Sequence, residues 1–401
     1  MPSARQQLLA ALADELQDLE QRKLCRSLTV LDGIDGPRVQ VDGSWFINWC
    51  SNDYLGLSAH PAVIEAAAKA ASSWGVGARA SRLLAGTTRW HQRLEDGLAA
   101  WFGAEAAMVY STGYLANLGI FSALLCSQDL ILIDRLAHAS LIDAARLSRA
   151  TLRVFRHNDP AHVAALLKRA GRGGRRFIVT EGVFSMDGDR APLAALVEVA
   201  ESHGAILYLD DAHGAFMLGA RGRGSPEAAQ VSCDRLLYMG TLGKALGCQG
   251  GFVVGSRPLI KYLRNRSRAF IYTTAPAVPV IAAATEALRL VGDEPQRRAQ
   301  LGNRVERLYQ RLRRLQAVPS LPQRPSHIMP IRVGQTLQAL QLARQLWDRG
   351  IWAPAIRPPT VPEGTARLRL SVTALHTDAH IDALAAALRE ALCATNKRCV
   401  V

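Results

Sequence analysis

The stretch Ala205-Ile206-Leu207-Tyr208-Leu209-Asp210-Asp211-Ala212-His213-Gly214 joins a short apolar run to a turn of acidic and small residues. A short apolar run that polar residues follow at once is typical of a buried strand of a parallel sheet. The same pattern recurs at six other places, and amphipathic helical stretches separate the runs. These runs are 106–110, 130–133, 152–155, 177–180, 236–239 and 251–254. The sequence therefore predicts an α/β domain with a mostly parallel sheet of seven strands.

Different patterns flank this region on both sides. Leucines at helical spacing predict a helix over the first twenty residues, and Asp42-Gly43 between the apolar runs 39–41 and 45–47 predicts a hairpin. Beyond Pro276 the chain predicts a smaller α+β domain. Its expected elements are a long arginine-rich helix over 289–316, strands over 328–333 and 367–372, and helices over 336–350 and 379–392. We expect an N-terminal segment (1–55), a large α/β domain (56–285) and a small C-terminal domain (286–401).

The composition of the 401 residues limits the class of protein. Hydrophobic residues make up 49% and charged residues 20%, as in a folded chain rather than a disordered one. The net charge is +14, but only six of the 48 basic residues are lysine. We interpret this as a general arginine bias, with a solvated face on the helix within 289–314, and we expect no nucleic-acid partner.

Seven scattered cysteines without a C-x-x-C pair favour reduced thiols. The apolar run at the N-terminus is too short for a signal peptide, and no run approaches the length of a membrane span. The sequence therefore predicts a cytoplasmic protein without a membrane partner.

Two groups of residues follow predicted strands, where open α/β sheets bind their ligands. Ser111-Thr112-Gly113-Tyr114 opens a helix, and backbone N–H groups at such a positive helix end suit a phosphate.

Asp210 and His213 follow another strand and have three possible roles: a pair of metal ligands, an ion pair with arginine, or partners of a heterocycle. Metal would need further ligands at short spacing, and none is nearby, so no metal site is predicted.

A glycine-flanked lysine follows a third strand, in Thr241-Leu242-Gly243-Lys244-Ala245-Leu246-Gly247. A partly buried lysine has its ammonium form disfavoured, which makes Lys244 a candidate Schiff-base nucleophile. The alternative is the phosphate-binding lysine of a Walker loop, but the G-x-x-x-x-G-K-[ST] spacing is absent. The phosphate turn, the aspartate and the lysine together predict a pyridoxal-phosphate site.

Five motifs carry a family resemblance that covers about residues 24–392. They are Ser51-Asn52-Asp53-Tyr54-Leu55-Gly56-Leu57, His138-Ala139-Ser140, Thr180-Glu181-Gly182-Val183-Phe184-Ser185-Met186-Asp187-Gly188-Asp189, Asp210-Asp211-Ala212-His213-Gly214 and Gly243-Lys244. They resemble the α-oxoamine synthases, pyridoxal-phosphate enzymes of the aspartate-aminotransferase fold, which is fold type I. The resemblance implies an acyltransferase that condenses an amino acid with an acyl thioester and releases carbon dioxide.

The resemblance also implies roles for single residues around the cofactor. Lys244 would form the Schiff base and act as acid and base at the substrate Cα. Asp210 would pair with the pyridinium nitrogen, His213 with the phenolic oxygen, and His138 would stack on the ring. The remaining cofactor contacts would be Gly113 and Tyr114 at the phosphate turn, the hydroxyls of Ser185 and Thr241, and Thr273 and Thr274. Those last two would reach the neighbouring subunit's phosphate, so a homodimer with shared sites is expected.

Other residues would bind the substrates. Arg369 resembles the arginine that holds the substrate carboxylate, to which a guanidinium can bind in bidentate fashion. Thr360 and Arg26 match positions near the acyl substrate, with Arg22 as the alternative to Arg26. His138 and Asn52 complete the expected contacts.

Two segments point to different substrates within the family. Residues 355–370 look most like the members that join L-alanine to a pimeloyl thioester, on coenzyme A or an acyl carrier protein, in biotin synthesis. Residues 241–247 are closer in style to members that use glycine. Alanine with the pimeloyl thioester is the expectation, and glycine with acetyl- or succinyl-CoA is the alternative.

Overall fold

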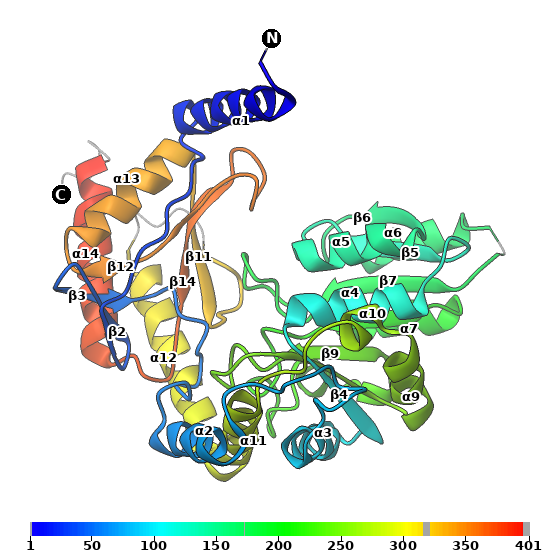
Figure 1. The fold of residues 1–401 in the computed structure, drawn as a ribbon. Coiled ribbons are helices and arrows are strands. Elements are labelled where there is room, and N and C mark those ends of the chain that lie inside the picture. Colours follow the sequence, from blue (N-terminus) through cyan, green and yellow to red (C-terminus); the bar gives the residue numbers. More distant parts are fainter. Residues whose placement is uncertain (1, 172, 316–320, 396–401) are drawn as a thin grey trace. The chain divides into compact units, whose positions relative to one another are not determined.

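The computed structural model of the chain describes residues 2–171, 173–315 and 321–395. Its contacts divide the chain into two compact units (Figure 1). One unit comprises Asn52–Gly302, and the other combines Met1–Ser51 with Asn303–Val401. We call them the central unit and the terminal unit.

A seven-stranded sheet forms the middle of the central unit, in the order β4-β10-β9-β8-β7-β5-β6. β10 is antiparallel to both of its neighbours, and the pairs β9-β8, β8-β7, β7-β5 and β5-β6 are parallel. The strands are β4 (Ala106–Tyr110), β5 (Leu130–Asp134), β6 (Thr151–Phe155), β7 (Arg176–Glu181), β8 (Ile206–Asp210), β9 (Leu237–Thr241) and β10 (Gly251–Gly255). Each of the seven predicted apolar runs is thus a strand, and the predicted mostly parallel sheet is confirmed.

The helices of the central unit lie before, between and after these strands. They are α2 (Pro61–Trp74), α3 (Arg89–Phe102), α4 (Gly113–Leu124), α5 (Ala139–Ser148), α6 (Pro160–Lys168), α7 (Leu193–Ser202), α8 (Ser225–Ala228), α9 (Arg257–Arg266), α10 (Arg268–Ile271) and α11 (Val278–Asp293), with a 3-10 turn at Cys233–Arg235. Of these, α4 to α8 connect β4 to β9 in the βα alternation that the sequence predicts. α11 packs along α2, and α4 packs on α5 and β10.

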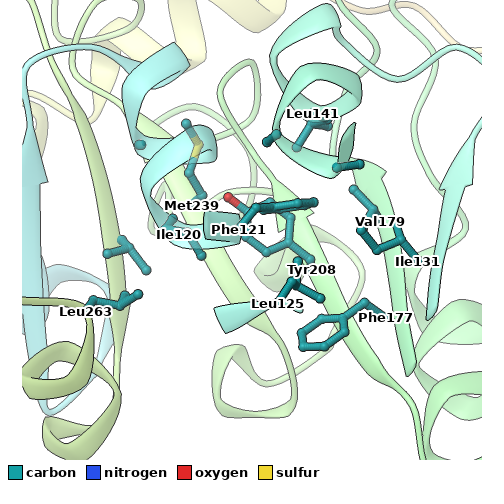
Figure 2. Close-up of a cluster of buried hydrophobic side chains, with 14 of the residues drawn as sticks. Ile120, Phe121, Leu125, Ile131, Leu141, Phe177, Val179, Tyr208, Met239 and Leu263 are labelled. Atoms are coloured by element: carbon teal, nitrogen blue, oxygen red, sulfur yellow. The ribbon is translucent and has the colours of Figure 1, made fainter. Parts of the chain in front are cut away.

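A cluster of buried hydrophobic side chains lies around α4 and the sheet (Figure 2). Phe121 on α4 meets the ring of Tyr208 on β8 edge to face, with the ring centroids 4.8 Å apart. Ile131, Val179 and Met239 line the same cluster from three strands. This packing fixes α4 against the sheet and so sets the position of its first turn.

The terminal unit combines the two ends of the chain. It contains α1 (Ala4–Gln21), α13 (Thr336–Trp347) and α14 (Asp378–Thr395). Its two sheets have the orders β1-β2-β3-β12 and β11-β14-β13. The strands are β1 (Gly33–Asp35), β2 (Arg38–Val41), β3 (Ser44–Asn48), β11 (Ile328–Gly334), β12 (Ile351–Trp352), β13 (Ala355–Ile356) and β14 (Ala366–Ser371).

The predicted hairpin is confirmed. β2 and β3 pair antiparallel with Val41 opposite Ser44. Asp42 and Gly43 both have a positive φ, 47° and 74°. Positive φ at both central residues is the geometry of a type I′ turn, which suits the twist of a hairpin.

The single long helix predicted over 289–316 is wrong. The structure has two helices there, α11 and α12 (Gln296–Arg313), and the break falls at Glu294 and Pro295. Proline lacks a backbone N–H and its ring clashes with the preceding turn, so it interrupts a helix that polarity alone would continue.

The arginine-rich face of α12 is also less solvated than the sequence suggested. Arg307 contacts Asp378 and Asp382 of α14 at 3.2 Å each, and Arg311 contacts Asp382 at 2.8 Å. Part of the positive charge therefore forms a network of ion pairs between two helices. None of the helices in the described part of the chain is long and apolar enough to cross a membrane.

Candidate active site

The parallel strands end at one edge of the central sheet, and the predicted site residues follow those ends. Gly113 follows β4, Lys244 follows β9, Asp210 ends β8, and His138 follows β5. The topology therefore brings together residues that lie up to 131 positions apart in the sequence. This is the edge where open α/β sheets bind their ligands.

Asp210 is buried, and both oxygens of its carboxylate accept hydrogen bonds. Oδ1 accepts from the backbone N–H of Ala212 at 3.0 Å, and Oδ2 accepts from Asn117 Nδ2 at 2.8 Å. The amide of Asn117 is itself oriented, because its Oδ1 accepts from the hydroxyl of Tyr208 at 2.6 Å. The carboxylate is therefore held in one orientation before any ligand binds.

A chain of hydrogen bonds runs from Asp210 to His138. Asn117 Nδ2 also donates to Ser140 Oγ at 2.8 Å, and Ser140 Oγ lies 2.7 Å from His138 Nδ1. The backbone N–H of Ser140 points at the same Nδ1 at 3.2 Å. Because a backbone N–H can only donate, Nδ1 of His138 is an acceptor. His138 is therefore a neutral imidazole that carries its hydrogen on Nε2.

The charges around His138 agree with this assignment. Burial lowers the pKa of His138, and the Lys244 cation lowers it further, against the opposing effects of Asp210 and Asp143. A neutral ring with one outward N–H can stack on a flat ligand and still donate one hydrogen bond.

Glu181 ties two of the loops at this edge together. Its Oε1 accepts from the backbone N–H of His138 at 2.7 Å, and its Oε2 accepts from that of Ser185 at 3.3 Å. Burial and the Asp210 carboxylate raise the pKa of Glu181 to about 8, although the Lys244 cation works in the opposite direction. The buried Glu181 side chain thus connects the backbone of His138 to that of Ser185.

Thr241 orders the turn that carries Lys244. Its hydroxyl donates to the carbonyl of Gly250 at 2.8 Å and accepts from the backbone N–H of Gly243 at 3.1 Å. The hydroxyl hydrogen is therefore committed within the turn, and a direct donation to a cofactor would require it to change partner. Lys244 itself is half-buried.

The first turn of α4 offers backbone amides at the same edge. Thr112 caps it, accepting from Leu115 N–H with its Oγ1 at 3.1 Å and from Ala116 N–H with its carbonyl at 3.0 Å. A helix leaves its first N–H groups without acceptors of its own, so those of Gly113 and Tyr114 remain for an anion. A Cβ at Gly251 would lie 2.7 Å from Gly113 Cα, which shows how closely the turn packs on β10.

Tyr114 is 43% exposed, and its hydroxyl donates a short hydrogen bond to Asp143. Its side chain is therefore anchored to α5.

His213 is held by Tyr54 and Asn52. The hydroxyl of Tyr54 donates to Asn52 Oδ1 at 3.0 Å and lies 2.8 Å from His213 Nδ1. One hydroxyl hydrogen cannot serve both partners, so His213 Nδ1 carries a hydrogen and donates to the Tyr54 oxygen. Asn52 is thus connected to His213.

Thr274 and Ser185 lie in loops of the central unit. Thr274 forms a β-bridge with Ser81, and its carbonyl accepts from Ser111 Oγ at 3.4 Å. Thr273 is the half-buried neighbour of Thr274. Ser185 lies in the loop between β7 and α7, which Glu181 braces.

The expected substrate residues Arg369, Arg26 and Thr360 belong to the terminal unit. Arg369 is 6% exposed in β14 and donates from Nη1 to Ser371 Oγ at 2.7 Å. Arg26 Nη2 donates to Thr360 Oγ1 at 3.1 Å, so the structure brings these two together. The alternative, Arg22, instead contacts Asp18 at 3.1 Å.

Sequence reasoning missed three residues of this site: Asn117, Ser140 and Glu181. Ser140 and Glu181 lie inside the quoted motifs, where a polar residue beside a predicted ligand is a usable signal. Asn117 gives no such signal, because its partner Asp210 is 93 residues away. Among the described residues, no cluster of three or more His, Cys, Asp or Glu could hold a metal ion.

Comparisons with known proteins identify the family of the chain. The family model of aminotransferase class I and II matches residues 45–388. An 8-amino-7-oxononanoate synthase from Nitrosomonas europaea is 46% identical over 387 residues, which cover 96% of this chain and 99% of that protein.

Solved structures show the same fold. A serine palmitoyltransferase from S. paucimobilis, with a bound PLP–myriocin aldimine, has a TM-score of 0.90 at 32% identity and covers 95% of this chain and 96% of its own. An 8-amino-7-oxononanoate synthase from Francisella tularensis has a TM-score of 0.75 at 27% identity, covering 88% and 99%. The chain belongs to the aminotransferase class I and II family, with the type I fold that its sequence predicts.

Proposed function

We propose that this protein is an 8-amino-7-oxononanoate synthase that uses pyridoxal phosphate to join L-alanine to a pimeloyl thioester. Carbon dioxide and the free thiol are the other products. The buried Asp210 carboxylate, which Asn117 orients at the sheet edge where β9 leads to Lys244, carries the cofactor part of the proposal. The substrates rest on the 46% identity to a curated relative. The relative from Nitrosomonas europaea bears the same activity in its name.

The residues present fit pyridoxal phosphate. The first turn of α4 presents the amides of Gly113 and Tyr114 to a phosphate, and Asp210 presents a fixed carboxylate to a pyridine nitrogen. When bound, the cofactor supplies an aldehyde that reacts with amines and a ring that accepts electrons from the substrate Cα.

Four residues of the chain have separate roles in the proposed reaction. Asp210 holds a proton on the ring nitrogen, because a buried carboxylate favours a cation beside it. Lys244 would hold the cofactor aldehyde through its amine, and the freed amine would be the base for the substrate Cα proton. His138, a neutral donor at Nε2, orients the ligand from one side. Arg369 binds the substrate carboxylate as a buried guanidinium.

The remaining predicted contacts are part of the same proposal. His213 donates at Nδ1 to Tyr54, which orients its ring toward the phenolic oxygen. Ser185, Thr241, Thr273 and Thr274 complete the cofactor contacts, and Arg26, Thr360 and Asn52 the substrate contacts.

A steady-state assay tests the substrate assignment. We expect the purified holoenzyme to release thiol from pimeloyl-CoA with L-alanine, and kcat/KM for alanine to exceed that for glycine by at least about tenfold. A pocket that accommodates one extra methyl group discriminates by roughly 10–200-fold. A preference for glycine, with acetyl- or succinyl-CoA as the better acyl donor, would contradict the proposal.

We also propose that two copies of the chain form a homodimer whose sites share residues. The bridge between Ser81 and Thr274 joins two segments that carry exposed apolar side chains. These side chains are Val76 (83% exposed), Leu83 (54%), Leu84 (81%) and Tyr272 (72%). Such a group beside predicted phosphate ligands suits burial against a second copy.

The oligomeric state tests this surface. Leu84→Glu places a charge in it, so we expect sedimentation to show mostly monomer, with at least tenfold weaker binding of pyridoxal phosphate. Leu147→Glu, at a leucine 60% exposed on α5, is the control and should stay dimeric. A Leu84→Glu protein that remains dimeric and binds the cofactor normally would refute the placement.

We place the protein in the cytoplasm. Five described cysteines, Cys25, Cys50, Cys126, Cys233 and Cys248, are free thiols, as reducing compartments maintain them.

A further inference from the structure

A second cluster of charged groups lies at the same edge of the central sheet, outside the residues assigned above. Asp134 ends β5, His157 follows the end of β6, and Asp189 lies in the loop after β7. Nδ1 of His157 lies 2.8 Å from Asp134 Oδ1, and Nε2 lies 2.7 Å from Asp189 Oδ2. One imidazole therefore bridges a carboxylate at the end of β5 and a carboxylate in the loop after β7.

The geometry fixes the charge of this imidazole. Carboxylate oxygens only accept hydrogen bonds when ionised, so both ring nitrogens of His157 must donate, which requires the imidazolium form. The two carboxylates raise the pKa of His157 to about 9 in spite of its burial, which acts in the opposite direction. The edge of the ring also packs against Phe184, with centroids 4.4 Å apart.

Asn158 extends the same connection. Its backbone N–H donates to Asp134 Oδ2 at 2.9 Å, and its Nδ2 donates to Asp189 Oδ2 at 2.8 Å. It adopts a positive φ of 53°, a conformation that asparagine tolerates better than most residues. His157 and Asn158 thus connect the same two carboxylates side by side.

The loops that His157 connects are the ones that carry predicted cofactor ligands. Asp134 also accepts from the backbone N–H of Leu136 at 2.8 Å, and this turn leads directly to His138. Asp189 closes the loop of Ser185, since the Phe184 N–H donates to its carbonyl at 3.0 Å. Glu181 joins the same two loops at His138 and Ser185.

We propose that His157, as a cation between Asp134 and Asp189, is a positioning residue that fixes the turn 134–138 and the loop 183–190 relative to each other. It thereby fixes the positions of the cofactor-binding residues His138 and Ser185, and it acts on them through these two segments. The proposal rests on the proposed function in so far as those two residues bind the cofactor. A displacement of about 1 Å at a reacting group costs roughly 10²-fold in rate.

The proposal makes the connection depend on pH. The groups that face His157 are Asp134, Asp189, Asn158 and the ring of Phe184. Because its pKa is raised on folding, the stabilising contribution of His157 is complete below the ordinary value of 6.5 and is lost as the pH rises through about 9.

Hydrogen exchange of the cofactor-free protein tests the connection directly. In His157→Gln we expect the amides of 134–138 and 183–190 to lose at least tenfold in protection at pH 7, while the core strands β7 and β8 keep theirs. In the parent, protection of 183–190, corrected for the intrinsic rate, should fall with a midpoint near pH 9. In Asp189→Asn that midpoint should lie lower, because one of the two carboxylate charges is gone.

Steady-state activity of the holoenzyme completes the test. We expect His157→Gln to lose about 10²-fold in kcat, with a smaller change in KM for alanine. Glu198→Gln, at an exposed carboxylate on α7, is the control. Should His157→Gln fail to fold, Asp189→Asn carries the test, since that carboxylate is 36% exposed.

Unchanged protection in both loops, or a loss spread evenly over the central unit, would overturn the proposal. If the parent protein shows the expected exchange but binds no pyridoxal phosphate, the proposed function alone is contradicted, so the two failures are distinguishable.

Discussion

Lys244→Ala is expected to lower kcat by at least about 10⁴-fold while the protein stays folded. General acid–base catalysis by one side chain contributes roughly 10²–10⁴-fold, and loss of the covalent bond to the cofactor adds to this. The side chain lies in a turn that Thr241 orders through backbone contacts, so removal of the lysine leaves the turn's hydrogen bonds in place. Turnover and the visible absorption of the holoenzyme measure the two effects.

Lys261→Ala is the matched control, because Lys261 is an exposed lysine on α9 of the same unit. It should keep the parent's rate and its visible band. Dialysis against buffer separates covalent from non-covalent binding: the parent and Lys261→Ala should retain pyridoxal phosphate, and Lys244→Ala should lose it. A Lys244→Ala protein that turns over alanine within tenfold of the parent would refute the assignment of this lysine.

The sequence predicts the central sheet well because its signals are local. A buried strand between helices needs about four to eight consecutive apolar residues, and 206–209 and 130–133 carry that signal within themselves. The order of polar residues at the strand ends is local too, so Asp210, Lys244 and the turn at Gly113 could be found before the structure. The signal for the break between α11 and α12 was equally local. Pro295 interrupts the helix there, although the polar pattern of the neighbouring residues favours a continuous one.

The hydrogen bonds that orient these groups could not be found in the same way. Asn117 meets Asp210, and His157 meets Asp134 and Asp189, across 93, 23 and 32 positions of the chain. Such contacts depend on which strands are neighbours in the sheet, and the order β8-β7-β5-β6 is a property of the whole fold. The domain limits drawn from the sequence stay a prediction.

The adjacent residues Asp210 and Asp211 show the same limit at a single site. The pattern alone gives two carboxylates at the strand end. In the structure Asp211 turns away into a structural network, in which it accepts from Ser225 N–H and the Tyr238 hydroxyl at 2.8 Å each. Burial raises the pKa of Asp211 to about 7. Asp211 therefore belongs to that structural network, whereas Asp210 is the carboxylate that Asn117 orients.

Asp210→Asn is therefore expected to lower kcat by roughly 10²–10⁴-fold, the equivalent of about 3–5 kcal/mol for removal of one partner of a buried charge pair. The asparagine is nearly the same size, but its amide nitrogen cannot accept a hydrogen bond, so the contact to Asn117 Nδ2 or to the Ala212 N–H is lost together with the charge. The proposed function needs a proton on the ring nitrogen, and a neutral amide does not stabilise that cation. Steady-state rates with alanine and pimeloyl-CoA measure the effect.

Asp96→Asn, at an exposed aspartate on α3, controls for the general loss of one negative charge and should leave kcat unchanged. Asp211→Asn provides the sharper contrast, because its side chain stabilises the fold through Ser225 and Tyr238. We expect it to lower the melting temperature more than Asp210→Asn does. If Asp210→Asn kept full activity, the site would not need a carboxylate at the ring nitrogen, and its buried orientation by Asn117 would have to serve the fold alone.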